Sequence, residues 1–194
     1  NYPLPFFSEA AAIISKFYNI PFILTGHGAF EMSLDSLIGV FGSVFNRTFF
    51  QVPLSPADRI HVSNERIRNQ ISVYDRYRSK VEVIPMGVDT DWYNPGICES
   101  SPPYTAKEDR PVLLFVGSFR RYKQVSLLIE AVDLLPTDVQ LVLIGDGPEY
   151  NSITTKIDTR SLSEHVDLLG HVSDEELRAA YDYADIFVLP SSSI

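Results

Sequence analysis

The chain has 194 residues, of which 45% are hydrophobic, and its 16 Lys and Arg against 25 Asp and Glu give a formal net charge of −9. This length corresponds to one domain or to parts of two, with enough apolar residues for a buried core. The acidic balance lacks the broad positive field that a polyphosphate backbone attracts, so we expect no nucleic-acid partner.

The first half of the chain alternates helical and extended patterns. We expect helices near residues 6–17, 36–57 and 64–77, and strands at residues 22–25, 59–62 and 81–84. The segment 36–57 has a wide apolar face without flanking Lys or Arg, which predicts a core or acceptor-pocket helix. A peripheral membrane contact is the alternative for this helix, and no stretch of about 18 uninterrupted apolar residues predicts a membrane span.

Residues 95–110 are rich in proline and polar residues, and we expect them to link a first domain at residues 1–94 to a second at residues 111–194. In the second domain we expect strands at residues 112–116, 139–144, 166–169 and 185–189, and helices at residues 124–135, 149–160 and 174–183. Ser173 followed by Glu176 predicts a capping box at the last helix. Near-continuous apolar strands are typical of parallel sheets, so we predict an α/β fold of two doubly wound, Rossmann-like units.

Each predicted sheet has fewer strands than a complete doubly wound unit. The first lacks its opening strands, and the second lacks its closing strands. The chain begins with Asn1 and ends with Ile194 just after an apolar run, so we expect a piece of a longer protein. Its single cysteine, Cys98, cannot form an internal disulfide, and no charged-then-apolar leader opens the chain. We therefore expect a cytoplasmic location.

A basic cluster follows the expected strand at residues 112–116. Gly117 and Ser118 lead into Arg120, Arg121 and Lys123, directly before a helix. Because ligands bind beyond the carboxyl ends of parallel strands, and because cations beside a helix N-terminus suit phosphate oxygens, this cluster predicts a phosphate site. A solvated basic turn is the alternative.

Two other strand ends carry glycine. The strand at residues 22–25 leads into Gly26-His27-Gly28, where the imidazole is placed either for a ligand or for a structural role. Gly145 and Gly147 follow the strand at residues 139–144 and would let a ligand approach the backbone, but they do not complete a dinucleotide-binding fingerprint.

The sequence offers little for a metal. Asp89 and Asp91 form an Asp-x-Asp pair without a third ligand close in sequence, so we expect no metal site. His61, His165 and His171 stand alone and are each expected to be structural. The motifs of the common serine hydrolases, zinc enzymes and P-loop proteins are also missing.

Seven segments in order resemble a retaining family-4 glycosyltransferase of the GT-B fold, a member of the glycosyl transferases group 1. They are PFILTGHG at residues 21–28, ADRIHVS at 57–63, VIPMGVD at 83–89, FVGSFRRYK at 115–123, IGDGP at 144–148, LGHV at 169–172 and ADIFVLPS at 184–191. Each segment is weak alone, and their order and spacing make the resemblance specific.

The resemblance implies transfer of a sugar from a nucleotide-sugar donor to an acceptor hydroxyl of a sugar, glycan or glycolipid. It implies retention of the anomeric configuration, with neither a metal nor another cofactor. His27 would be the catalytic residue facing the reacting sugar, with Gly26 and Gly28 on the acceptor side. The residues implied for the donor site are Gly117, Ser118, Arg120, Arg121, Lys123, Gly145, Gly147, His171 and Val172.

Within that set, the resemblance implies that Lys123 binds the donor diphosphate. It also implies that His171 and Val172 line the nucleoside pocket. The sequence departs from the family at Ser118, where an Arg is usual, and at Gln124, where a Gly is usual. Arg120 or Arg121 is the candidate replacement for that Arg. The chain also stops before the family's acidic pair and lacks its N-terminal glycine-rich loop, so we expect weak or no transfer by this polypeptide alone.

Three alternatives remain at this point. A GT-B nucleotide-sugar epimerase would share the fold and donor site, and the sequence around His27 favours the transferase. A non-catalytic module that binds a nucleotide sugar or a protein partner is compatible with Ser118 and Gln124. The missing fingerprint argues against a dinucleotide-dependent dehydrogenase. The sequence predicts no oligomeric state.

Overall fold

The computed structural model describes residues 7–26, 53–70, 72–96, 100–107, 110–136 and 138–192. The chain divides into two compact units, Asn1–Val88 and Asp89–Ile194. Within the described ranges, no helix has the length and apolar character needed to cross a membrane.

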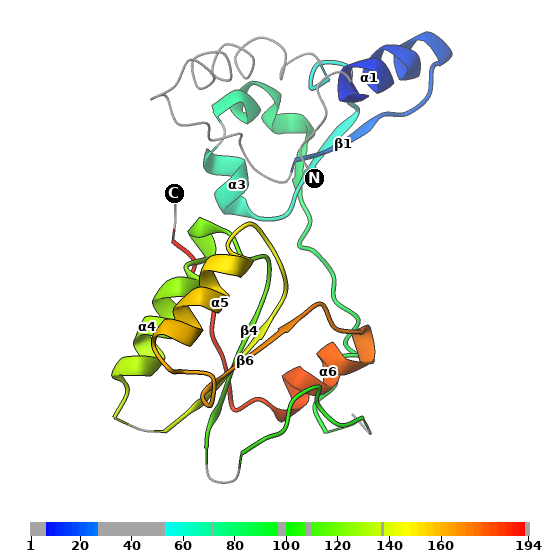
Figure 1. Ribbon diagram of the computed structural model, residues 1–194. Helices are drawn as coiled ribbons and strands as arrows, with labels where there is room; N and C mark the ends of the chain where they lie inside the picture. Colours follow the sequence, from blue (N-terminus) through cyan, green and yellow to red (C-terminus); the bar gives the residue numbers. More distant parts are fainter. Residues whose placement is uncertain are drawn as a thin grey trace, which may run out of the picture. The chain divides into compact units, whose positions relative to one another are not determined.

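The first unit contains a parallel sheet with strand order β1-β2-β3 (Figure 1). Its strands are β1 (Ile23–Gly26), β2 (Arg59–Val62) and β3 (Val81–Val83), and its helices are α1 (Phe7–Tyr18), α3 (Glu65–Gln70) and the 3₁₀ helix η2 (Ser72–Lys80). The core of this unit consists of Leu54, Ala57, Ile60, Val62 and Val81.

Two expected helices of the first unit differ from the structure. The helix expected at residues 64–77 is divided into α3 and η2, because the polar sequence of η2 has no continuous apolar stripe to select α-helical packing. Within η2 the backbone has a further kink at Tyr77. Residues 53–56, near the end of the helix expected at residues 36–57, form a turn instead, because they include Pro53 and Pro56. Residues 36–52 lie outside the described part.

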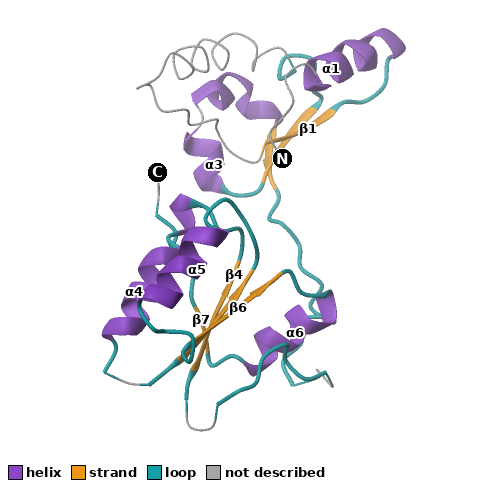
Figure 2. Ribbon diagram, in the orientation of Figure 1, coloured by secondary structure: helices purple, strands orange, loops and turns teal. Residues whose placement is uncertain are grey.

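The second unit contains a parallel sheet with strand order β6-β5-β4-β7, which confirms the predicted α/β architecture. Its strands are β4 (Val112–Val116), β5 (Gln140–Ile144), β6 (Val166–Gly170) and β7 (Ile186–Phe187), and its helices are η3 (Arg121–Lys123), α4 (Val125–Leu134), α5 (Tyr150–Thr159) and α6 (Asp174–Tyr183). Helices α4 and α5 cover one face of the sheet and α6 covers the other (Figure 2). All five residues of β5 are buried, as expected for a strand between two helical layers.

The capping box of α6 is confirmed. The Ser173 hydroxyl accepts a hydrogen bond from the Glu176 amide at 3.2 Å, and the Glu176 carboxylate accepts one from the Ser173 amide at 2.8 Å. The strand expected at residues 185–189 is shorter, because β7 pairs only with β4, at Ile186 and Phe187.

The strand order of the second unit has a topological switch point between β4 and β7. From β4 the chain winds through α4 and α5 on one face, and it returns to β7 through α6 on the other face. Ligands of open α/β sheets bind at such a point, beyond the carboxyl ends of the strands. The loop after β4 is therefore the first place to look for a ligand site.

Candidate functional site

The loops of the second unit meet beyond the carboxyl ends of its strands. The Gly117 amide donates to the Ile144 carbonyl at 3.0 Å, and the Gly145 amide donates to the Gly170 carbonyl at 2.8 Å. Backbone pairing thus continues one residue past the ends of β4 and β5. The structure brings together at this edge the segments that contain the donor-site residues expected from the sequence.

Gly145 and Gly147 allow the β5 loop to lie directly against the β4 loop. Gly145 has a φ of +137°, and a Cβ there would lie 2.0 Å from the Gly117 carbonyl oxygen. A Cβ on Gly147 would lie 2.7 Å from the Phe119 amide nitrogen. The space that a side chain would occupy at both positions is filled by the backbone of the neighbouring loop.

Phe119 anchors the loop that carries the cations, and sequence reasoning missed this role. Its side chain is fully buried, with the ring stacked on Tyr150 at a centroid distance of 6.0 Å. Its amide donates to the Asp146 carbonyl at 2.8 Å, and its carbonyl accepts from the Glu149 amide at 3.1 Å. The feature of the sequence that indicates such an anchor is a large apolar residue placed between Ser118 and two arginines.

The cations lie on the turn between β4 and α4. Arg120 and Arg121 are exposed and Lys123 is half-buried, with its Nζ 5.5 Å from the centroid of the Tyr122 ring. Gln124 follows in the left-handed conformation (φ 52°, ψ 37°), and its side chain does not cap α4. The N-terminus of α4 adds its positive dipole to the three cationic side chains.

The charges of this turn differ from the other cations of the second unit. Four of those others form ion pairs with carboxylates: Lys107–Glu164, Arg110–Asp138, Lys156–Glu130 and Arg160–Asp133. The guanidinium of Arg178 lies 4.9 Å from the centroid of the Trp92 ring. Arg120, Arg121 and Lys123 have no acidic partner among the residues that the structure describes. Their charge can therefore act on a bound anion.

The other expected site residues are distributed as follows. His171 is exposed directly after β6, and Val172 is half-buried against the core on the α6 face of the sheet. Gly26 is the buried last residue of β1, paired with Val62. His27 and Gly28 lie outside the described residues.

Two of the histidines expected to be structural make contacts of that kind. His61 Nε2 lies 2.7 Å from the Ile84 carbonyl oxygen, and His165 Nδ1 lies 3.0 Å from an Asp138 carboxylate oxygen. Asp89 caps a turn, since its carboxylate accepts from the Asp91 and Trp92 amides at 3.0 and 2.9 Å. Across the described ranges, no three His, Cys, Asp or Glu residues are grouped to hold a metal ion.

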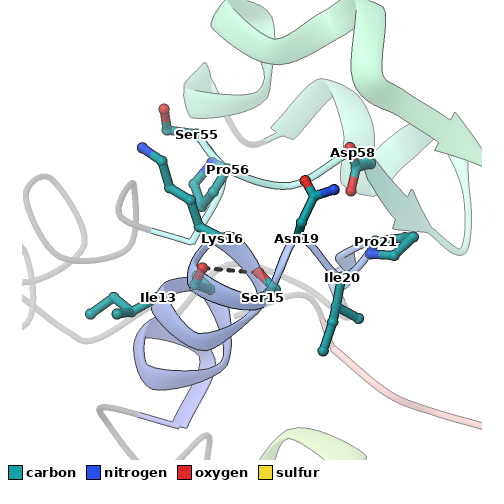
Figure 3. A pocket seen from close by; sticks show the side chains of 10 residues that line it. Ile13, Ser15, Lys16, Asn19, Ile20, Pro21, Ser55, Pro56 and Asp58 are labelled. Carbon is teal, nitrogen blue, oxygen red and sulfur yellow. Dashed lines mark hydrogen bonds between the residues drawn. The ribbon is translucent and has the colours of Figure 1, made fainter.

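The first unit has a hollow of about 660 Å³ between α1 and the turn before β2 (Figure 3). Ile13, Lys16, Asn19 and Asp58 are among its lining residues. One Asp58 carboxylate oxygen already accepts the Phe22 amide at 2.8 Å. This hollow lies at the amino ends of β1 and β2, and among the residues that the structure describes, none of the site residues expected from the sequence lines it.

Two family models match the chain: Glycosyltransferase Family 4 over residues 1–92, and Glycosyl transferases group 1 over residues 98–193. The chain belongs to the GT-B glycosyltransferase superfamily. The cationic turn of this glycosyltransferase chain lies within the part matched by the group 1 model.

Curated relatives of this glycosyltransferase chain include an uncharacterized glycosyltransferase of Methanocaldococcus jannaschii, 32% identical over 94% of the chain and 46% of the relative. The D-rhamnosyltransferase WbpZ of Pseudomonas aeruginosa is 30% identical over 71% of the chain and 35% of the relative. The D-inositol 3-phosphate glycosyltransferase of Mycolicibacterium smegmatis is 29% identical over 74% and 34%. The chain thus spans less than half the length of these relatives.

Solved structures have the same fold as this glycosyltransferase chain. Anabaena HepE in complex with UDP and glucose matches with a TM-score of 0.67 at 18% identity, over 95% of the chain and 50% of HepE. The sucrose-phosphate synthase of Thermosynechococcus elongatus matches with a TM-score of 0.67 at 20% identity, over 95% of the chain and 48% of the synthase. At these identities the likeness establishes the fold.

Proposed function

We propose that the protein containing this chain transfers a sugar from a nucleotide-sugar donor to an acceptor hydroxyl. The observation that carries the proposal is the cluster of Arg120, Arg121 and Lys123, unpaired among the described residues, beside the switch point of a GT-B sheet. A diphosphate is the donor group that such a cluster binds, through point charge and guanidinium forks. The HepE complexes with UDP and with UDP-glucose support a donor of this class.

Lys123 has the central role in the proposed reaction. Its ammonium would bind the donor diphosphate and offset the negative charge that grows on the nucleotide as the bond to the sugar breaks. Ser118 is neutral, so Arg120 or Arg121 would supply the second cation. Because these side chains supply positive charge at the leaving group, the proposed reaction requires no metal.

The remaining roles follow the resemblance to family 4. His171 and Val172 would line the nucleoside pocket, and His27 would face the reacting sugar from the first unit, with Gly26 and Gly28 beside the acceptor. The acceptor would be a sugar, glycan or glycolipid. We propose that the configuration at the anomeric carbon is retained.

We also propose that this chain is part of a longer transferase. Strands β1 and β7 lie at the edges of their sheets in the described structure, each paired with a neighbour on one side. Apolar side chains on these strands are exposed: Ile186 and Phe187 of β7 are 53% and 47% exposed, and Ile23 of β1 is 66% exposed. Further strands or helices of a longer protein would cover these apolar residues. The 194-residue chain alone should transfer sugar weakly or not at all, and transfer clearly above that of a boiled control would contradict this expectation.

Calorimetric titration with UDP, GDP and ADP tests the donor site. One nucleotide should bind saturably, and Lys123→Ala should weaken its binding about tenfold or more, because a charge-assisted hydrogen bond is lost. Lys107→Ala is the matched control, since it removes the same charge from a lysine paired with Glu164. Equal nucleotide affinity in the wild-type and Lys123→Ala chains would contradict a diphosphate role for Lys123 and would favour a non-catalytic module.

A further inference from the structure

The segment that follows β7 is bonded to the turn that carries the cations. The Ser192 amide donates a hydrogen bond to the Tyr122 carbonyl at 2.9 Å, across 70 residues of sequence. The Ser192 hydroxyl lies 3.5 Å from the same oxygen, at the limit of a hydrogen bond. The main connection is therefore the backbone N–H of Ser192.

This hydrogen bond acts on the peptide unit that leads into Lys123. The Tyr122 carbonyl and the Lys123 amide belong to one rigid plane. The Lys123 amide donates to the Arg120 carbonyl at 2.8 Å, while the Tyr122 carbonyl accepts from Ser192. Both polar atoms of the plane are thus held, one by the local 3₁₀ turn and the other by the segment that follows β7.

The turn is attached to its surroundings at two places. On the β5 side, Phe119 is buried and bonded to the Asp146 carbonyl. On the β7 side, the attachment is the bond from Ser192 to Tyr122. Lysine has a long side chain with large rotamer entropy, so a fixed backbone origin lowers the entropy lost when its ammonium binds a phosphate.

We infer that the Ser192 backbone amide is a positioning group for Lys123, which ties the diphosphate site to the segment that follows β7. The inference rests on the proposed function, because it gives Lys123 a diphosphate to bind. Ser192 acts through the Tyr122–Lys123 peptide and does not itself contact the donor.

Two variants of the full chain separate the amide from the side chain. Ser192→Pro removes the N–H donor, whereas Ser192→Ala removes only the hydroxyl and is the matched control. We expect Ser192→Pro to raise the dissociation constant for UDP about tenfold and to leave the constant for uridine unchanged, since uridine has no phosphate. Ser192→Ala should stay within about twofold of wild type. An unchanged UDP affinity in Ser192→Pro overturns the inference.

A chain that ends at Ser191 also lacks the Ser192 amide, and it contains no added proline. This chain is used in place of Ser192→Pro if the thermal melt of that variant differs from that of wild type. A double-mutant cycle then tests whether the effect passes through Lys123. In the Lys123→Ala background, loss of the Ser192 amide should have no further effect on UDP affinity. An equal loss in both backgrounds overturns the positioning role.

Amide hydrogen exchange separates failure of this inference from failure of the proposed function. The Lys123 amide should exchange faster in Ser192→Pro than in Ser192→Ala, with or without nucleotide, and equal rates overturn the inference. If the exchange result holds but wild type binds none of UDP, GDP and ADP, the proposed donor site is wrong, while the Ser192 amide still fixes the backbone at Lys123. If wild type binds UDP and Ser192→Pro binds it equally, only the inference fails.

Discussion

At the residue scale, Gly145 controls how closely the β5 loop lies against the cationic loop. Its φ of +137° is unfavourable for residues with a side chain, and the site of its missing Cβ is 2.0 Å from the Gly117 carbonyl oxygen. A side chain at position 145 must therefore push the two loops apart. Such a movement would displace the turn that carries Lys123.

We expect Gly145→Ala to lower the free energy of unfolding by about 2 kcal/mol or more and to weaken nucleotide binding. Gly87→Ala is the matched control, because a Cβ on Gly87 meets no heavy atom within 4 Å. Urea unfolding and calorimetric titration of both variants provide the measurement. Equal stability and equal nucleotide affinity in the two variants would show that the loop approach is unimportant.

Tyr104 is a second residue whose environment makes a measurable difference. Its side chain is 8% exposed, and its hydroxyl has no hydrogen-bond partner among the described residues. Burial, followed by the nearby carboxylates of Asp185 and Asp167, raises the pKa of Tyr104 from 10.0 to about 12. The unfolded chain therefore releases this proton at lower pH than the folded chain.

This pKa shift predicts a specific pH dependence of stability. The contribution of Tyr104 is complete below pH 10 and is lost as the pH rises from about 10 to about 12, because the unfolded state ionises first. Tyr104→Phe should remove that part of the decline. At pH 7 the variant should be more stable by about 1 kcal/mol, because it no longer buries an unpaired hydroxyl. Urea unfolding between pH 7 and pH 11.5 checks both effects, and parallel profiles for the two chains would contradict the prediction.

At the element scale, the capping box makes the start of α6 a defined boundary. Ser173→Ala should lower the free energy of unfolding by about 1 kcal/mol and leave nucleotide affinity unchanged. The hydrogen bond from the Ser173 amide, and then the Ser173 hydroxyl, lowers the pKa of Glu176, so the part of the box that depends on the Glu176 carboxylate is lost as the pH falls through that pKa. Ser163→Ala, in the exposed turn before β6, is the control. An equal effect of the two substitutions on urea unfolding at pH 7 would contradict a capping role.

The elements that could be predicted from sequence are those whose pattern is local. Strands β2 and β4 and helix α6 have the predicted boundaries, because apolar runs and a capping box define them. The last strand is shorter than predicted because its length depends on pairing with β4. The division of residues 64–77 also depends on packing, which the local sequence does not determine.

The candidate site shows the same division between local and long-range information. The cations after β4 could be found because a parallel sheet gathers the carboxyl ends of its strands at one edge. The anchoring role of Phe119 and the bond from Ser192 to Tyr122 depend on segments 27 to 70 residues away, so no local pattern indicates them. Gly147 was predicted as a site residue, but its contact with Phe119 required the structure.

At the scale of the whole molecule, the cationic turn stands out from an acidic chain. The net charge of −9 repels a diphosphate at long range, so binding depends on the three cations that stand close together. The carboxyl edge of the second sheet gathers those cations with the loops after β5 and β6. We therefore expect these loops to form one site for a nucleoside diphosphate.

The most direct test is to map UDP binding residue by residue on the ¹⁵N-labelled chain by nuclear magnetic resonance. We expect the amide signals of Gly117–Gln124, Gly145–Gly147 and Gly170–Val172 to shift together with one dissociation constant, and those of the hollow between α1 and Asp58 not to shift. Lys123→Ala should raise that dissociation constant about tenfold or more, so that the same signals shift only at correspondingly higher UDP concentrations. Shifts confined to the first unit, or shifts that persist unchanged in Lys123→Ala, would contradict a diphosphate site at these loops.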